Sequence, residues 1–205
     1  MHTAGRRRTP GIGRRLPLLA IAVAQLRKHD RLTGLGNRSR FRQVSHRAID
    51  RGARTGRHMA VLMIGMNGFK EISDTLGHEA GDRLLVEFAG VLRRCVQGPG
   101  LPARLGGDEF AVVLPEIRNP GEAYETAGRI AASLGPVLID GRLVTLAAGI
   151  GVAVAAPGTL THDGIVHRAG LAMDKAKSLG PQTRWAIWQE SLEPPAASGE
   201  LADAA

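Results

Sequence analysis

The sequence predicts an α/β fold in which helices cover a mixed β-sheet. Apolar residues recur at helical spacing in some segments and form short uninterrupted runs in others, and the two kinds of segment alternate along the chain. Glycine, proline and an Asp-Gly pair lie between the segments, as is typical of turns that join helices to strands. A chain of 205 residues suits one such domain with an extension at each end.

Two helices and three strands are expected in the first half of the chain. The segment "RFRQVSHRAIDRGAR" (40–54) places its apolar residues on one helical face, and "DRLLVEFAGVLRRCV" (82–96) is a second, strongly amphipathic helix. The run "HMAVLMIGM" (58–66) is apolar almost throughout, which predicts a strand buried on both faces. Two glycines lie between "LPARL" (101–105) and "EFAVVLP" (109–115), and this pattern predicts a hairpin.

The second half is expected to contain two helices, a hairpin and a last strand. A helical pattern over 121–135 ends at a glycine that precedes a proline, which is a common stop signal. Asp140-Gly141 is a strong hairpin-turn signal, and it lies between two strand-like runs. The segment 161–180 has a helical pattern, and "TRWAIW" (183–188) predicts the last strand.

Both ends of the chain differ in composition from the domain between them. Residues 1–15 carry five arginines and no acid, whereas 190–205 carry four acids and no base, so both are predicted to be disordered. The apolar run 16–26 is shorter than the roughly 20 residues that span a bilayer, and it predicts an amphipathic or coiled leading helix. The expected organisation is an N-terminal extension over 1–27, one domain over 28–188 and an acidic tail over 189–205.

The composition argues against several classes of protein. The net charge of +8 is accompanied by only 3% aromatic residues, so the chain lacks the base-stacking surface of a specific nucleic-acid binder. A membrane protein is not expected, because the apolar runs are short. The single cysteine, Cys95, rules out an internal disulfide and is expected in the core of a cytoplasmic protein. His162 and His167, five residues apart, do not share a helical face and are expected to be solvated.

Four short segments carry residues suited to nucleotide chemistry: "DRLTGLGNR" (30–38), "NGFKEISDTLGHEAGD" (67–82), "RLGGDEF" (104–110) and "DKAKSLG" (174–180). A Gly-Gly turn lets another molecule approach the main chain, and the carboxylates that follow it, Asp108 and Glu109, can reach a divalent cation. Mg²⁺ commonly takes one or two carboxylates and the phosphates of its substrate. Lys70, at a helix start, and Lys177 are suitable phosphate partners. Each segment alone is equally compatible with a solvated turn or a surface lysine.

Together, the four segments resemble the motifs of the GGDEF domain, the family of diguanylate cyclases. "RLGGDEF" matches the family's loop in full, and "DRLTGLGNR" resembles its D-x-L-T-G-L-x-N-R turn. "GFKEISDTLGHEAGD" is similar to F-K-x-I-N-D-x-x-G-H-x-x-G-D, and "AMDKAK" to A-x-Y-x-A-K. The resemblance covers Lys28 to Trp188. It implies an α/β fold with a central, mostly antiparallel five-stranded sheet ringed by helices, as in nucleotidyl cyclases and polymerase palms.

The resemblance also implies an activity and its partners. Members of the family condense two GTP molecules into cyclic di-GMP on two subunits that meet head to head. The 3′-hydroxyl of each GTP attacks the α-phosphate of the other and releases pyrophosphate, with Mg²⁺ or Mn²⁺ stabilising the developing charge. The expected partners are therefore GTP, a second copy of the chain and proteins of the cyclic di-GMP pathway.

The family's functional residues can be carried over position by position. Asp108 and Glu109 would be the catalytic residues and metal ligands, with the main-chain carbonyl of Met66 as a further ligand. The residues implied in binding the substrate are Gly106, Gly107, Phe69, Lys70, Ser73, Asp82 and Lys177.

Several departures from the family pattern bear on this chemistry. Gly65 stands where the family has its metal-binding aspartate, and Asn67 replaces a second acid. Loss of a group around a metal commonly costs at least roughly 10–100-fold in affinity or activity, so weak metal binding is expected. Ser73 replaces the guanine-reading asparagine and cannot offer paired donor and acceptor groups. Pro181 stands where an arginine is common, and "QGPG" (97–100) lacks both charges of the R-x-x-D product site.

These departures favour a degenerate GGDEF module that binds GTP or a partner protein and has weak or no cyclase activity. The alternative is a working diguanylate cyclase that uses Asp108 and Glu109 with a displaced metal, and the intact "GGDEF" keeps it open. A third hypothesis, from another class, is nucleic-acid binding through the basic N-terminus. Salt-dependent binding that disappears when residues 1–15 are deleted would support it.

Overall fold

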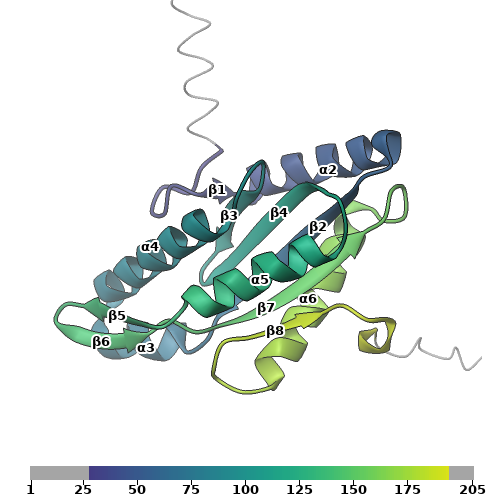
Figure 1. Ribbon diagram of the computed structural model, residues 1–205. Helices are drawn as coiled ribbons and strands as arrows, with labels where there is room; N and C mark the ends of the chain where they lie inside the picture. The colour runs from purple at the N-terminus through teal and green to yellow at the C-terminus, as the bar shows by residue number, and fades with distance from the viewer. Residues whose placement is uncertain (1–27, 194–205) are drawn as a thin grey trace, which may run out of the picture.

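A six-stranded sheet forms the centre of the computed structural model, which describes residues 28–193 (Figure 1). In spatial order its strands are β1 (Gly36–Asn37), β3 (Leu101–Gly106), β4 (Glu109–Ile117), β2 (His58–Met66), β7 (Ala148–Ala155) and β8 (Arg184–Ile187). The three central pairings are antiparallel, and only the two edge pairings, β1 with β3 and β7 with β8, are parallel. The predicted fold class is therefore confirmed.

Helices cover both faces of the sheet (Figure 1). Helices α4 (His78–Cys95) and α5 (Gly121–Ser133) pack on one face, and α2 (Arg38–Thr55) and α6 (His162–Ser178) pack on the other. The short helix α3 (Phe69–Leu76) follows β2 directly and leads into α4. None of the helices within residues 28–193 is long and apolar enough to cross a membrane.

Strand β2 lies in the interior of the sheet, where it pairs with β4 on one side and β7 on the other. Its alternate residues face opposite layers: Leu62 and Ile64 join the core under α4 and α5, whereas Val61 and Met63 join the core under α2 and α6. This double burial explains why the segment is apolar throughout rather than alternating. Gly65 continues the face that lies under α6, and Met66 continues the opposite face.

The structure differs from the sequence expectation in the region after α5. The Asp140-Gly141 turn does form a hairpin, but β5 (Pro136–Ile139) and β6 (Arg142–Thr145) pair only with each other and stay outside the central sheet. The strand-like run after the turn is divided into β6 and β7 at residues 146–147. Period-2 and apolar patterns identify strands but do not say which sheet a strand joins, since pairing partners are set by tertiary packing.

Smaller differences lie at the ends of elements and of the domain. The two-residue β1 extends the expected five-stranded sheet to six, and the helix expected from residue 82 begins at His78. Residues 189–193, expected in the disordered tail, are ordered: a 3-10 turn, Glu190–Leu192, is followed by Glu193, whose carboxylate lies 3.2 Å from Nε2 of His167. The leading helix expected over 16–26 lies outside the described residues.

Candidate functional site

The Gly-Gly turn and its two carboxylates form the tip of the β3–β4 hairpin. Gly106 and Gly107 both have positive φ, at 143° and 52°, a conformation that side chains with a β-carbon seldom adopt. The main-chain oxygen of Asp108 accepts a hydrogen bond of 3.2 Å from the amide of Met66, so the tip is attached to the end of β2. The Asp108 side chain is half-buried and that of Glu109 is exposed. Both acids therefore lie at the end of the central sheet.

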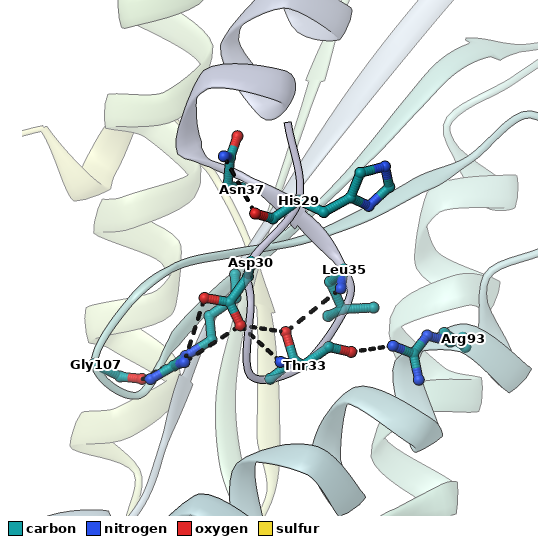
Figure 2. A network of polar contacts seen from close by, with 8 residues as sticks. His29, Asp30, Thr33, Leu35, Asn37, Arg93 and Gly107 are labelled. Atoms are coloured by element: carbon teal, nitrogen blue, oxygen red, sulfur yellow. Dashed lines mark hydrogen bonds and ion pairs between the residues drawn. The ribbon is translucent and has the colours of Figure 1, made fainter. Parts of the chain in front are cut away.

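Polar contacts with the "DRLTGLGNR" segment brace this turn, and Figure 2 shows the network around Asp30. Its central contact is an ion pair between Asp30 and Arg104. The Arg104 guanidinium donates to the carbonyl oxygen of Gly107 at 2.9 and 2.8 Å, and its third nitrogen lies 3.3 Å from the Asp30 carboxylate. Asp30 also accepts hydrogen bonds from the amide and the hydroxyl of Thr33, at 2.8 and 2.6 Å. The Thr33 carbonyl in turn accepts from Arg93 on α4. The shape of the turn is thus set by Arg104 within the hairpin and by two distant segments, the loop of Asp30 and Thr33 and the helix α4.

The electrostatics of Asp30 fit this bracing role. Burial by itself raises the pKa of the Asp30 carboxyl, but the hydrogen bonds from Thr33 and the charge of Arg104 together outweigh burial and lower the pKa below its ordinary 3.8. Asp30 is therefore a carboxylate at neutral pH. Sequence analysis singled out its segment as a motif but gave neither Asp30 nor Arg104 a role, because the contact joins residues that are far apart in the chain.

Glu109 lies beside a second arginine. Arg38, the first residue of α2, donates to the carbonyl of Leu105 at 3.1 Å and reaches the Glu109 carboxylate at 3.9 Å. Both side chains of this pair are largely exposed, at 69% and 48%, so solvent screens the attraction. The pair can hold Glu109 near the hairpin, but it contributes little to stability.

The end of β2 has no acidic side chain, and a lysine occupies the space where one would stand. A β-carbon built at Gly65 would lie 2.3 Å from Nζ and 2.6 Å from Cε of Lys177, and 3.3 Å from the sulfur of Met173. Gly65 is directly opposite Glu109 in the β2–β4 pairing, so side chains at the two positions share one face of the sheet. The space that an aspartate side chain at position 65 would need is thus occupied by the Lys177 ammonium from α6.

The residues present do not fit a divalent cation. Within residues 28–193 no group of three or more His, Cys, Asp or Glu side chains is arranged to hold a metal. Asp108, Glu109 and the Met66 carbonyl remain as oxygen donors, but a positive charge lies beside them at Gly65. Mg²⁺ and Lys⁺ repel each other, and Mg²⁺ depends on nearby carboxylates to offset its cost of dehydration.

The residues expected to contact the base lie farther along, on α3 and α4. Ser73 is buried, and its hydroxyl lies 3.3 Å from Nδ1 of His78 and packs under Gly81. Asp82 is exposed and lines a cavity of about 410 Å³ between Leu32 and the β5–β6 hairpin. Ser73 does not line this cavity. The two residues are nevertheless close, because Ser73 lies under Gly81, the residue before Asp82, and their role in binding a base stays a prediction.

Three further predicted positions have clear structural settings. Phe69 and Lys70 are the first two residues of α3, with Phe69 half-buried and the Lys70 side chain exposed to solvent. Asn67 donates to the carbonyls of Pro181 and Gln182, at 2.9 and 3.3 Å, so this amide holds the loop that follows α6. An aspartate there could not donate these hydrogen bonds, which accounts for the amide.

The segment 97–100 lines a cavity of about 380 Å³ together with Arg118 and Arg129. Both arginines are engaged: Arg118 lies 3.8 Å from the Glu122 carboxylate, and Arg129 donates to the hydroxyl of Thr126 at 2.9 Å. Because the segment lacks both charges of the family's product site, we expect it not to bind cyclic di-GMP, and this stays a prediction.

Comparison with known proteins gives a consistent result. The family model described as "Diguanylate cyclase, GGDEF domain" matches residues 27–183. Diguanylate cyclase TpbB of Pseudomonas aeruginosa is 39% identical over 158 residues, which cover 76% of this chain and 36% of TpbB. An uncharacterized signaling protein of Caulobacter vibrioides is 40% identical over 160 residues, covering 77% of this chain and 20% of that protein. The chain thus spans a minor part of the length of these relatives.

Solved structures show the same similarity. The GGDEF domain of TpbB from Pseudomonas aeruginosa superposes with a TM-score of 0.75 at 37% identity, covering 80% of this chain and 96% of that one. A sensory box/GGDEF family protein from Caulobacter crescentus gives 0.69 at 41% identity, covering 75% and 99%. Diguanylate cyclase SiaD of Pseudomonas aeruginosa, solved with its activator SiaC, gives 0.72 at 29% identity, covering 83% and 66%.

Proposed function

The chain belongs to the GGDEF domain family of diguanylate cyclases, which acts in cyclic di-GMP signalling, and from that premise we propose that it is a degenerate module that binds GTP with weak or no cyclase activity. The observation that carries this proposal is the end of β2, where the Lys177 ammonium lies over Gly65. Diguanylate cyclases of the family use Mg²⁺ or Mn²⁺, and the donor set here does not fit either ion.

Several residues would still serve GTP. The Gly106-Gly107 turn lets a phosphate approach the main chain, and the exposed ammonium of Lys70 can reach phosphate oxygens by rotating its side chain. Asp82, in the cavity beside Leu32, can accept hydrogen bonds from the N1 and amino groups of guanine. GTP binding can therefore be retained. The negative charge that develops at the α-phosphate during the reaction, however, would have no metal ion to stabilise it.

Selectivity for guanine should be low. Ser73 is buried against His78 and Gly81 and does not line the cavity, so Asp82 would contact the base without a hydrogen bond from Ser73. An unsatisfied polar atom costs about 1–3 kcal/mol, so loss of one hydrogen bond reduces discrimination between GTP and ATP. We propose residues 28–188 as the module and expect it to act on other proteins of the pathway or on a second copy of itself.

The experiment is an incubation of the purified chain with GTP and either Mg²⁺ or Mn²⁺, followed by chromatographic separation of the products. GTP and ATP affinities are measured alongside by calorimetry. We expect GTP binding, weak preference over ATP and little or no cyclic di-GMP. Sustained production of cyclic di-GMP by the unmodified chain would overturn the proposal in favour of an active cyclase.

An active cyclase is the second candidate, and one observation supports it. The hairpin tip is held in shape by Arg104 and by the amide of Met66, so Asp108 and Glu109 are presented on an ordered loop. Two nucleotides can react only when they are held in the correct orientation, and an ordered loop helps to hold them. Product that disappears in Glu109→Gln would assign the activity to this loop.

A further inference from the structure

Helix α2 carries a large excess of positive charge. It contains six arginines and a single acid, Asp50, and its first turn has no acid, although acids are favoured at the start of a helix. The residues that it buries against the sheet are small or apolar: Phe41, Ser45, Ala48 and Gly52. In Figure 1 the helix runs along the margin of the described domain. The charge of α2 is therefore displayed on the outside of the molecule.

Three of these arginines form a stripe along the exposed side of the helix. Arg47, Arg51 and Arg54 are spaced by four and by three residues, so their side chains share one helical face, and all three are exposed. We call these three residues the arginine stripe. Arg40 lies seven residues before Arg47 and so on the same side of the helix, and the exposed Arg57 follows the helix end. The stripe is thus the centre of a longer basic surface.

The charges of the arginine stripe are not compensated within the domain. Their side chains make no hydrogen bond or ion pair with any part of residues 28–193, and the neighbouring Asp50 does not pair with them. Arg57, by contrast, lies 3.6 Å from the Glu116 carboxylate. Like charges three or four residues apart on a helix repel each other. A partner with negative charge would relieve this repulsion.

The sequence next to the domain indicates which anionic partner fits. Residues 1–15 carry five arginines, and the apolar run 16–26 follows them. The surface of an anionic bilayer suits both kinds of segment, because its headgroups attract arginine and its acyl boundary takes up apolar side chains. A nucleic acid offers phosphates, but it has no place for a run of Leu, Ile and Val. The chain also has only 3% aromatic residues to stack on bases.

We propose that the arginine stripe binds the surface of a membrane that contains anionic phospholipids, with α2 lying against the headgroups. Such peripheral binding needs no membrane-spanning helix. It also leaves the candidate nucleotide site free. Arg38, which reaches Glu109, lies nine residues before Arg47, and this separation corresponds to roughly 13 Å along the helix. The inference is therefore independent of the proposed GTP binding.

The experiment is co-sedimentation of the full chain with vesicles. One preparation contains phosphatidylcholine alone, and the other is an equimolar mixture of phosphatidylcholine and phosphatidylglycerol. We expect binding to the anionic vesicles only, and weaker binding as salt is raised from about 0.1 M to about 1 M, because ions screen the attraction. Each arginine near an anionic surface strengthens binding roughly fivefold, so Arg47→Gln/Arg51→Gln/Arg54→Gln should lower the partition coefficient roughly 100-fold.

A second triple variant is the matched control. Arg94→Gln/Arg142→Gln/Arg184→Gln removes three exposed arginines from α4, β6 and β8, so both triple variants lower the net charge by the same amount. We expect the control to lose less than roughly fivefold in the partition coefficient, because its arginines lie outside the proposed surface. Circular dichroism of both variants checks that they are folded.

The outcomes decide between the stripe, the overall charge and another class of partner. Equal losses in the two folded triple variants would show that net charge drives binding and would overturn the inference. So would unchanged binding of the stripe variant, or equal binding to both vesicle preparations. The same chain is also titrated with duplex DNA at matched phosphate concentration and salt. Tighter binding to the duplex than to the anionic vesicles would overturn the inference in favour of nucleic-acid binding.

Discussion

The hairpin tip and the end of β2 lie next to each other, joined by the hydrogen bond from the Met66 amide to Asp108, yet they are built in different ways. The tip is held by polar contacts from the Arg104 guanidinium, which Asp30 orients in turn. The end of β2 is a glycine surface under a flexible lysine. The Gly-Gly loop can therefore keep its shape through Arg104, while Lys177 of α6 sets the charge at the neighbouring end of β2.

The largest effect is expected from Gly151 of β7, where the backbone of α6 lies against the sheet. In Gly151→Ala, the new β-carbon would lie 2.1 Å from the carbonyl oxygen of Ala169 and from the amide nitrogen of Met173. Helix α6 must move away from the sheet, which should cost roughly 1–3 kcal/mol or more of the free energy of unfolding. Urea unfolding measures it. Gly65→Ala is the matched control, because its new β-carbon meets only the ends of the Lys177 and Met173 side chains. Equal losses of stability in the two variants would show that a backbone contact and a side-chain contact cost the same.

The bracing of the hairpin tip is tested next. Arg104→Ala removes the two hydrogen bonds to Gly107 and the partner of Asp30, and should destabilise the domain by about 1–3 kcal/mol. A double-mutant cycle with Asp30→Asn should give a coupling free energy of about 0.5–3 kcal/mol from unfolding curves. Additive effects of the two changes would mean that the two side chains act independently, and the tip would not be braced by their pairing.

The first turn of α6 should be sensitive to mild acid. His162, in the first turn of α6, is buried against Phe41 and His46, contrary to the expectation that it is solvated. Burial first, and then the neighbouring His46, lower the pKa of His162 below its ordinary 6.5. The unfolded chain therefore takes up a proton first, and stability falls as the pH drops below 6.5 towards the lowered value.

This pH effect is measured as the midpoint of urea unfolding between about pH 8 and about pH 5. His162→Phe should reduce the loss, whereas His167→Gln, at an exposed site paired with Glu193, should leave most of it. Equal acid sensitivity of the unmodified chain and His162→Phe would contradict the assignment.

The smallest effect is expected at Asp30, in stronger acid. Because the pKa of Asp30 in the folded chain is below 3.8, its stabilisation is complete at higher pH and is lost as the pH falls through that range. The stability difference between the unmodified chain and Asp30→Asn should therefore shrink below pH 3.8. A difference that stayed constant from pH 6 to about 3 would show that the charge of Asp30 does not matter. As the pH falls, α6 should weaken before the hairpin tip does.

Much of the fold could be predicted from the sequence because the strongest signals are local. The apolar run 58–66 corresponds to β2 without a shift, and the Gly-Gly turn lies between two strands as expected. Cys95 is buried, as its apolar helical run indicated. The β5–β6 hairpin could be recognised from Asp140-Gly141, but its separation from the central sheet could not, since strand pairing is decided by packing between distant segments.

The candidate site divides in the same way. The sequence by itself determined which loop carries Asp108 and Glu109 and that Gly65 lacks a carboxylate. Only the tertiary structure decided what fills the space at Gly65, and that Arg104 connects Asp30 to the turn. The physical reason is that helix α6 approaches closely over the glycines of β7 and β2. This close approach lays the Lys177 side chain across two strands, and a contact of that kind leaves no local pattern in the chain.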